Sequence, residues 1–479
     1  MVVGRILAKA VDFAVLLVLT HLLQPADFGL VAMGSTLVLV VEAILELPLT
    51  HALVRLQEPT PAAFDTAFTL SVLRGALLAL VVAALAYPMA LFYREPRLVS
   101  LVMALALGPA VKALLSPRMV LYQRQLDFRW AAGVDVIGKV VAFVAASAVA
   151  YGTQSYWAIA VANVTTPLVT VSLSYVIAPY RPRFGLSEWS QFADMMGWHT
   201  LSQVSSALNW QMDKFLLGRF TQPVELGRFF MAENVAAIPN SSIIGPVTAP
   251  LLAAFAPLRD NPASIKHAYA RASSAVLMVG APPLLGLVVL ANPLVRLIFD
   301  PKWADAAPIM AMVALANLLP LPAEPMTGLA MSLNKTRWVT VRSALNLAVR
   351  LPATLVGAAY FGVPGAIAAR ALANAMMLGT GVYLAQRLID FPVHEQVRNL
   401  VRPFVALGAF ALTLLALAPL LAKLPAGPWL AAGILGASCS ATMVYVLTAY
   451  LAWNWAGRPP GVEAVAATRL MHVRERLRR

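Results

Sequence analysis

Charged residues are scarce in this sequence. They make up 12% of its 479 residues, whereas a soluble domain carries roughly 25%, and hydrophobic residues make up 60%. Apolar runs of about 20 residues recur along the chain, each long enough to cross a bilayer core with its backbone amides bonded inside its own helix. The composition therefore excludes a soluble protein and predicts an all-α integral membrane protein.

Cysteine is almost absent as well. The single Cys439 lies in an apolar segment, so the sequence can form neither a disulfide framework nor a cysteine metal site. The six histidines are scattered without the spacing of metal ligands, and no Walker-type glycine loop occurs. We therefore expect no metal site and no cofactor.

Basic residues outnumber acidic ones, giving a net charge of +14, but no compact basic domain, zinc spacing or RNA-binding signature suggests a nucleic-acid partner. Membrane proteins instead gather Lys and Arg in their cytoplasmic loops. With the N-terminus inside, the predicted cytoplasmic segments hold 22 Lys and Arg and the outer loops hold 6. This ratio predicts an even number of spans, the first of them uncleaved, and both termini in the cytoplasm.

The apolar runs predict about fourteen transmembrane helices. They group into two pseudo-symmetric six-helix lobes followed by two C-terminal helices. The expected domains are an N-terminal lobe over 1–178, a cytoplasmic linker over 179–194, a C-terminal lobe over 195–386, two additional transmembrane helices within 387–457 and a basic cytoplasmic tail over 458–479.

An internal repeat supports the two lobes. Gln24-Pro25-Ala26-Asp27-Phe28-Gly29 follows the first predicted span, and Gln222-Pro223-Val224-Glu225-Leu226-Gly227 follows the seventh. Later, Ala158-Ile159-Ala160 matches Ala366-Ile367-Ala368. Because each half has an even number of spans, the halves should be related by an axis along the membrane normal, which predicts a cavity between two lobes.

Several segments resemble one transporter family. Leu22-Leu23-Gln24-Pro25-Ala26-Asp27-Phe28-Gly29 and Asp213-Lys214-Phe215-Leu216-Leu217-Gly218 are similar to the motifs at the first and seventh helices of the Wzx-type polysaccharide flippases. These proteins belong to the multidrug, oligosaccharidyl-lipid and polysaccharide (MOP) exporter superfamily. Gln123-Arg124-Gln125-Leu126-Asp127-Phe128 and Phe299-Asp300-Pro301-Lys302-Trp303 resemble two of the family's loops, so the likeness covers almost the whole chain.

The resemblance implies a V-shaped bundle in the bacterial inner membrane that alternates between inward-open and outward-open states. The implied substrate is an undecaprenyl diphosphate-linked glycan. It would be carried from the cytoplasmic to the periplasmic leaflet for O-antigen, capsule or exopolysaccharide assembly, without ATP hydrolysis by the chain itself. Besides the lipid bilayer, the implied partners are polysaccharide polymerase and assembly proteins.

Three alternatives remain open. A MATE-type drug exporter shares the core, but a basic lining and the number of spans favour an anionic, lipid-linked cargo. A lipid II flippase is closer, and the Gln-Pro-x-acid-x-Gly pattern favours the polysaccharide branch over it. A membrane glycan polymerase or glycosyltransferase would need catalytic residues on a sizeable loop, and the sequence predicts none, so we do not expect an enzyme.

A diphosphate that crosses hydrocarbon needs Arg or Lys along a shielded path. Basic side chains near span ends can instead extend to the interface, which is how we interpret Lys112 and Arg296. Lys139 follows Asp135 by four residues, and this spacing favours a structural pair on one helix face. The candidate substrate-binding cations are Arg74, Lys139, Lys214, Arg342 and Arg370.

Carboxylates within the predicted spans form a second set. A proton or sodium site would need such groups, because neutralising them can bias a bundle with two states. Alternatively, Lys9 and the acidic residues of the first two spans form a structural ion-pair cluster. Asp213 with Lys214 is the favoured pair, since in the family this segment lines the centre of the second lobe. The candidate carboxylates are Asp12, Glu42, Glu46, Asp213 and Glu233, with Glu324 in the tenth span.

Prolines interrupt two of the predicted spans, the eighth over 229–257 and the tenth over 306–332. Broken helices suit a rocking transporter. Proline and glycine are also enriched in transmembrane helices generally, so the pattern has an ordinary explanation too.

Overall fold

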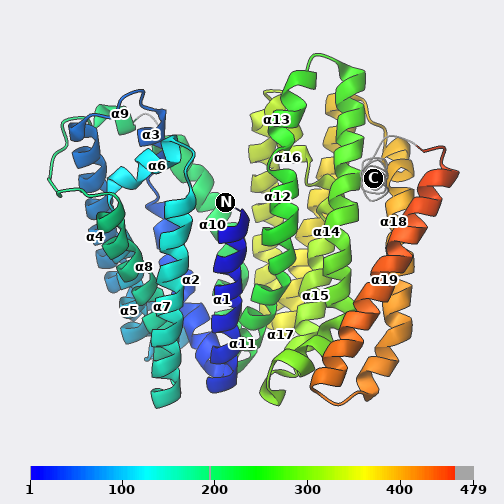
Figure 1. Cartoon of the computed structure of the whole chain (residues 1–479), viewed down its shortest axis with the longest axis horizontal. Coiled ribbons are helices and arrows are strands. Elements are labelled where there is room, and N and C mark those ends of the chain that lie inside the picture. Colours follow the sequence, from blue (N-terminus) through cyan, green and yellow to red (C-terminus); the bar gives the residue numbers. More distant parts are fainter. Residues whose placement is uncertain (1, 194–195, 459–479) are drawn as a thin grey trace, which may run out of the picture. The chain divides into compact units, whose positions relative to one another are not determined.

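The computed structural model describes residues 2–193 and 196–458, and every element of this part of the chain is a helix. The all-α prediction is confirmed. Apart from Arg458, the predicted basic tail lies outside the described residues. The chain divides into two compact units, unit 1 over Met1–Phe230 and unit 2 over Met231–Arg479. Within each unit the long helices run side by side (Figure 1).

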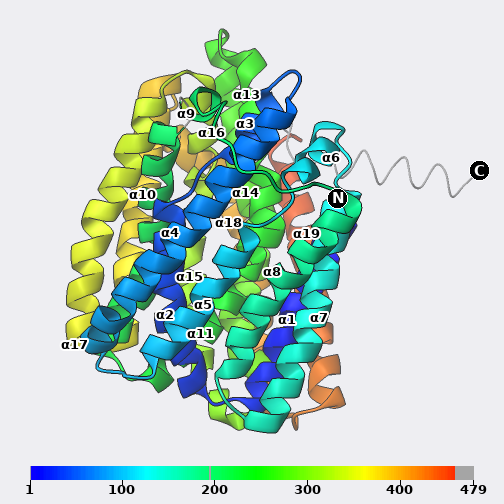
Figure 2. The ribbon, with the colours of Figure 1, turned by 90° about the vertical axis from the view of Figure 1, so that its left-hand side faces the viewer.

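Unit 1 is built on three helices that lie next to one another, with α5 packing against α4 on one side and α8 on the other. Figure 2 shows this face, together with α7 and α1. α10 packs along α2 and so belongs to unit 1, while the six-helix lobes stay a prediction. The elements are α1 (Val2–Leu22), α2 (Pro25–Ile44), α3 (Leu49–Arg55), α4 (Pro61–Tyr93), α5 (Leu98–Lys112), η1 (Pro117–Met119), α6 (Val120–Arg124), α7 (Arg129–Thr153), α8 (Trp157–Ile177), α9 (Ser190–Ala193), α10 (Met196–Phe220) and α11 (Pro223–Ala236), whose end lies in unit 2.

Unit 2 is organised around the long helix α14, which packs against α15 and α18, while α19 packs along α18. The remaining elements are η2 (Asn240–Ile244), α12 (Gly245–Thr248), α13 (Leu251–Phe255), η3 (Ala256–Leu258), α14 (Pro262–Ile298), η4 (Pro301–Trp303), α15 (Ala306–Leu318), η5 (Leu321–Ala323), α16 (Met326–Ser332), α17 (Thr336–Ile389), α18 (Val393–Lys423) and α19 (Pro428–Trp455).

Local sequence explains where the main helices begin. Pro25, Pro61 and Pro262 each occupy a first-turn position, where the missing amide hydrogen leaves no bond unmade. The side chain of Thr60 accepts a hydrogen bond from the Ala63 amide at 3.1 Å and so caps α4. In the repeat motif, the backbone amide of Gln24 donates a hydrogen bond to the Asp27 carboxylate at 2.9 Å, which closes a capping box at the start of α2.

The two spans expected to be broken are broken. After α11 the chain passes through the π-helical turn η2 and the short helices α12 and α13, and η5 separates α15 from α16. Proline removes a backbone donor and crowds the preceding turn, which accounts for both interruptions. A third break lies at Gly362 within α17, whose φ of 61° is in the left-handed region that favours glycine.

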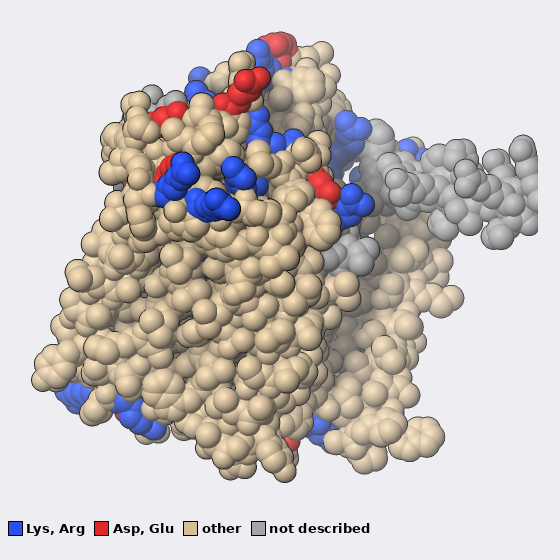
Figure 3. All heavy atoms as spheres, turned by 60° about the vertical axis from the view of Figure 1, so that its left-hand side comes forward, with Lys and Arg blue, Asp and Glu red and all other residues tan. Residues whose placement is uncertain are grey.

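Within residues 2–193 and 196–458, ten helices are long and apolar enough to cross a membrane, or up to eleven with the bent pair of α5 and the η1–α6 segment. α1 and α10 are not among the ten; α1 contains Arg5, Lys9 and Asp12. α17 counts once despite its break at Gly362. On the face of unit 1 seen in Figure 3, the band between the two ends carries almost no charged side chain, as expected of a surface in contact with lipid.

Candidate functional site

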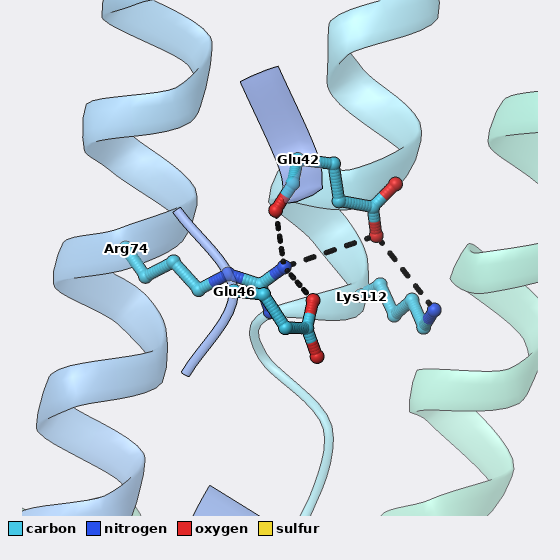
Figure 4. A network of polar contacts seen from close by, with 4 residues as sticks. All are labelled: Glu42, Glu46, Arg74 and Lys112. Carbon is cyan, nitrogen blue, oxygen red and sulfur yellow. Dashed lines mark hydrogen bonds and ion pairs between the residues drawn. The ribbon is translucent and has the colours of Figure 1, made fainter. Parts of the chain in front are cut away.

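A network of four charged side chains joins three helices of unit 1 (Figure 4). Arg74 on α4 places Nη2 2.7 Å from Oε2 of Glu46, just beyond the end of α2, and 4.0 Å from Oε1 of Glu42 on α2. Nη2 also donates to the Glu42 carbonyl oxygen at 3.3 Å. Lys112, in the last turn of α5, has Nζ 3.9 Å from the same Glu42 Oε1. Glu42 is therefore shared between two cations.

A second charged group joins α1 to α7. Nζ of Lys139 lies 2.8 Å from Oδ2 of Asp12 and 3.7 Å from Oδ2 of Asp135. The expected pair between Lys139 and Asp135 therefore exists, but the shorter contact is made with Asp12 on a different helix. Lys139 is mostly buried, and two nearby carboxylates keep its charge compensated.

These two groups meet in one cavity of about 440 Å³ inside unit 1. Asp12, Glu42, Lys112, Asp135 and Lys139 line it, and α8 adds polar side chains at Asn163, Thr166 and Thr170. With Glu46 and Arg74, the two groups together contain four carboxylates and three cations, and we call these seven side chains the charged network. Its formal charge is −1 when all are ionised.

Unit 2 contains its own buried ion pair. Nη2 of Arg370 on α17 lies 2.5 Å from Oε1 of Glu233 on α11, and the two side chains are only 7% and 13% exposed. Arg342, also on α17, is buried and donates through Nη2 to the carbonyl oxygens of Met377 at 3.1 Å and Ala323 at 3.4 Å. Glu324 interacts electrostatically with Arg342, so each of these two arginines has an acidic neighbour.

Asp213 and Lys214 on α10 do not point the same way, because successive residues of a helix face different directions. Asp213 is fully buried. The Lys214 ammonium lies 5.5 Å from the centroid of the Phe230 ring, a cation–π geometry. The two are therefore neighbours in sequence with different surroundings.

The two basic residues interpreted as interfacial both lie at helix ends, and that interpretation stays a prediction. Lys112, in the last turn of α5, has a side chain that is 69% exposed, and it lines the cavity with Nζ 3.9 Å from Glu42. Arg296, in the last turn of α14, caps α18 by donating to the carbonyl oxygens of Ala422 at 3.1 Å and Leu424 at 3.0 Å.

The sequence suggested that Lys9 pairs with the acidic residues of the first two spans. These acidic residues do form ion pairs, but with other cations. Asp12 pairs with Lys139, while Glu42 and Glu46 pair with Arg74.

Sequence reasoning also missed the polar face of α8 at Asn163, Thr166 and Thr170. Its signal was a three- and seven-residue spacing of polar groups, counted from Asn163, in an apolar helix. Among the described residues, no three His, Cys, Asp or Glu side chains form a group that could hold a metal ion.

One loop that resembles the transporter family has a structural role. Arg129 donates to Asp127 Oδ1 from its backbone amide at 3.1 Å and from Nε at 2.9 Å. These hydrogen bonds hold the pKa of the Asp127 carboxyl below its ordinary value. Leu126 before it has a positive φ of 57°, so the loop turns sharply and Asp127 secures the start of α7.

Comparison with known proteins gives a consistent picture. The family model described as polysaccharide biosynthesis protein matches residues 18–308. The succinoglycan biosynthesis transport protein ExoT of Rhizobium meliloti (strain 1021) is 26% identical over 317 residues, which are 64% of this chain and 62% of that protein. The chain thus spans less than two thirds of this relative's length. The lipopolysaccharide biosynthesis protein WzxC of Escherichia coli (strain K12) is 21% identical over 73% of this chain and 72% of that protein.

Among solved structures, the lipid II flippase MurJ in its inward closed conformation is similar with a TM-score of 0.71. The similarity covers 94% of this chain and 98% of that chain at 12% sequence identity. At this identity the likeness establishes a common fold and nothing about the cargo.

Proposed function

The chain belongs to the family of polysaccharide biosynthesis proteins, and on this premise we propose that it is a flippase for undecaprenyl diphosphate-linked oligosaccharide repeat units. It moves them from the cytoplasmic to the periplasmic leaflet of the inner membrane by alternating access, for O-antigen, capsule or exopolysaccharide synthesis. The observation that carries this proposal is the family match over 18–308, and two relatives support it, a succinoglycan biosynthesis transport protein and a lipopolysaccharide biosynthesis protein.

The proposed architecture has about fourteen membrane spans, with both termini in the cytoplasm. It counts the ten helices described above that are long and apolar enough to cross a membrane, and it adds α1, α10 and the second part of α17. The bent pair of α5 and the η1–α6 segment counts as one further span. We propose that these spans form two six-helix lobes and two C-terminal helices. The distribution of Lys and Arg supports the orientation.

We assign binding of the diphosphate to the cations within the spans, Arg74, Lys139, Lys214, Arg342 and Arg370. A buried cation needs a partner in the empty state, and carboxylates supply it for Arg74, Lys139 and Arg370. A diphosphate can take the place of such a carboxylate, because it offers the same charge-assisted hydrogen bonds to Arg and Lys. Pairing thus keeps these side chains charged and within the protein between transport cycles.

We also propose that the network in unit 1 couples transport to a proton or a sodium ion. Its four carboxylates exceed its three cations by one, which supports uptake of a single positive charge. Neutralising the network would change the relative stability of two helix arrangements. Polysaccharide polymerase and assembly proteins are the proposed partners that receive the flipped repeat unit.

The proposal is tested by measuring which leaflet holds undecaprenyl-linked repeat units, using an impermeant probe, in cells that lack the protein. A flippase predicts accumulation in the cytoplasmic leaflet with loss of polymer. Wild-type protein should restore export, whereas Arg74→Ala should not. Accumulation of the peptidoglycan precursor instead would assign the protein to lipid II, and normal glycan export with altered drug tolerance would assign it to drug efflux.

A further inference from the structure

A second cavity, of about 470 Å³, lies at the end of unit 1 where α8 ends and α4 begins. Its volume is in the range of small-ligand sites, roughly 300–1,000 Å³. It shares no lining residue with the charged network described above. Its polar lining consists of Arg118, Arg181, Arg183, Tyr175, Tyr180 and Asp65, and we call it the arginine pocket.

The arginine pocket carries excess positive charge. Its one carboxylate, Asp65, accepts a hydrogen bond from the Tyr180 hydroxyl at 2.6 Å. Burial and this hydrogen bond raise the pKa of Tyr180, so its hydroxyl stays neutral. Arg181 and Arg183 are exposed, and among the described residues no carboxylate pairs with either of them. Three guanidinium groups therefore face one acid that is already hydrogen-bonded.

The pocket is preformed, because the segment after α8 is attached to α4. The Gly185 amide donates to the Thr69 hydroxyl at 2.9 Å, and the Glu188 amide donates to the Thr66 hydroxyl at 3.3 Å. Arg118 Nη1 donates to the Pro179 carbonyl oxygen at 3.0 Å, which fixes the opposite wall. A site held in this way loses little conformational entropy when a ligand binds.

Large apolar side chains stand beside the basic pocket. Phe184 is 74% exposed, and Leu186 and Trp189 are also exposed. Basic residues next to exposed aromatic side chains suit the boundary between headgroups and acyl chains. On the face shown in Figure 3, Lys and Arg gather at the upper end of unit 1, above the uncharged band.

We propose that the arginine pocket binds the phosphate headgroup of an anionic phospholipid from the adjoining leaflet. The guanidinium groups hold the phosphate, as their planar donors favour. Phe184, Leu186 and Trp189 lie against the acyl chains, which a free phosphate would not have. In the orientation proposed above this is the cytoplasmic leaflet, but lipid binding does not depend on what the protein transports.

The test uses the full chain purified in neutral detergent and titrated with phosphatidylglycerol or phosphatidylcholine, with bound lipids counted by native mass spectrometry. Arg181→Gln/Arg183→Gln removes two charges and leaves the Arg118 hydrogen bond in place. Arg55→Gln/Arg398→Gln is the matched control, since both residues are exposed and lie outside the pocket. The melting temperature of each variant without added lipid verifies that it is folded.

Wild-type protein and the control should prefer phosphatidylglycerol. The pocket variant should bind it roughly 30-fold more weakly, since each basic residue near an anionic membrane surface adds about a factor of five. Equal binding by the pocket variant, or equal loss in the control, would overturn the proposal. If millimolar inorganic phosphate displaced the lipid as well as excess phosphatidylglycerol does, the ligand would be a soluble phosphate and the assignment to a lipid would be wrong.

Discussion

Gly29 on α2 and Gly227 on α11 lie against each other, and each is the last residue of one copy of the repeat motif. A Cβ atom added to Gly29 would lie 1.8 Å from the Pro223 carbonyl oxygen, and one added to Gly227 would lie 1.8 Å from the Pro25 carbonyl oxygen. The contact is reciprocal, so the two motif copies pack on one another through their first helical turns. The glycine of the Gln-Pro-x-acid-x-Gly pattern therefore allows α2 and α11 to pack closely, while its proline and acidic residue lie in the first turn of each helix.

Replacing either glycine by alanine should force the two helix starts apart. We expect Gly29→Ala and Gly227→Ala each to destabilise the protein by about 1–3 kcal/mol, the usual cost of overpacking. Gly133→Ala on α7 is the control, since nothing lies within 4 Å of its added Cβ. Melting temperatures in detergent measure the effect. Equal melting temperatures for Gly29→Ala and Gly133→Ala would show that the crossing adapts without cost.

Sequence patterns were informative where the relevant contacts are local. The apolar runs and the proline interruptions near Pro250 and Pro320 each depend on residues within one or two helical turns. The same is true of the Lys139–Asp135 pair, whose spacing along α7 is visible in the sequence. Local periodicity is therefore enough to locate such features.

Contacts between helices could not be predicted in the same way. Asp12, 127 residues away from Lys139, is its closer partner because α1 packs on α7. Lys112 lines a cavity because α2 brings Glu42 to the end of α5. The segment over 179–189, expected to belong to a linker, is hydrogen-bonded to α4 through Thr69 and Thr66. Helix packing decides these partners, and residue spacing does not encode it.

The ion pair between Arg370 and Glu233 allows stability and transport to be separated. Arg370→Met removes the cation that lies 2.5 Å from a buried carboxylate, and we expect a loss of about 3–5 kcal/mol. Adding Glu233→Gln removes that charge and should restore much of the melting temperature. If Arg370 also binds the diphosphate, the double variant should remain unable to export glycan.

Arg337→Met, at an exposed position on the same helix, is the control for loss of a positive charge. Recovery of both stability and export in the double variant would make the pair purely structural. Failure of the second substitution to raise the melting temperature would show that the buried carboxylate is not the cause of the instability.

Asp12 provides the sharpest test of coupling to a cation. Asp12→Asn lowers the number of carboxylates in the network from four to three, equal to its cations, so the ionised network becomes formally neutral. Uptake of a proton or a sodium ion would then leave the network with an uncompensated positive charge. In vesicles that contain the lipid-linked substrate, the rate of wild-type flipping should respond to an imposed proton or sodium gradient, and that of Asp12→Asn should not. Glu58→Gln removes an exposed carboxylate outside the network and should keep the wild-type response. An unchanged response in Asp12→Asn would separate the network from energy coupling and leave it a structural role in holding α1 against α7.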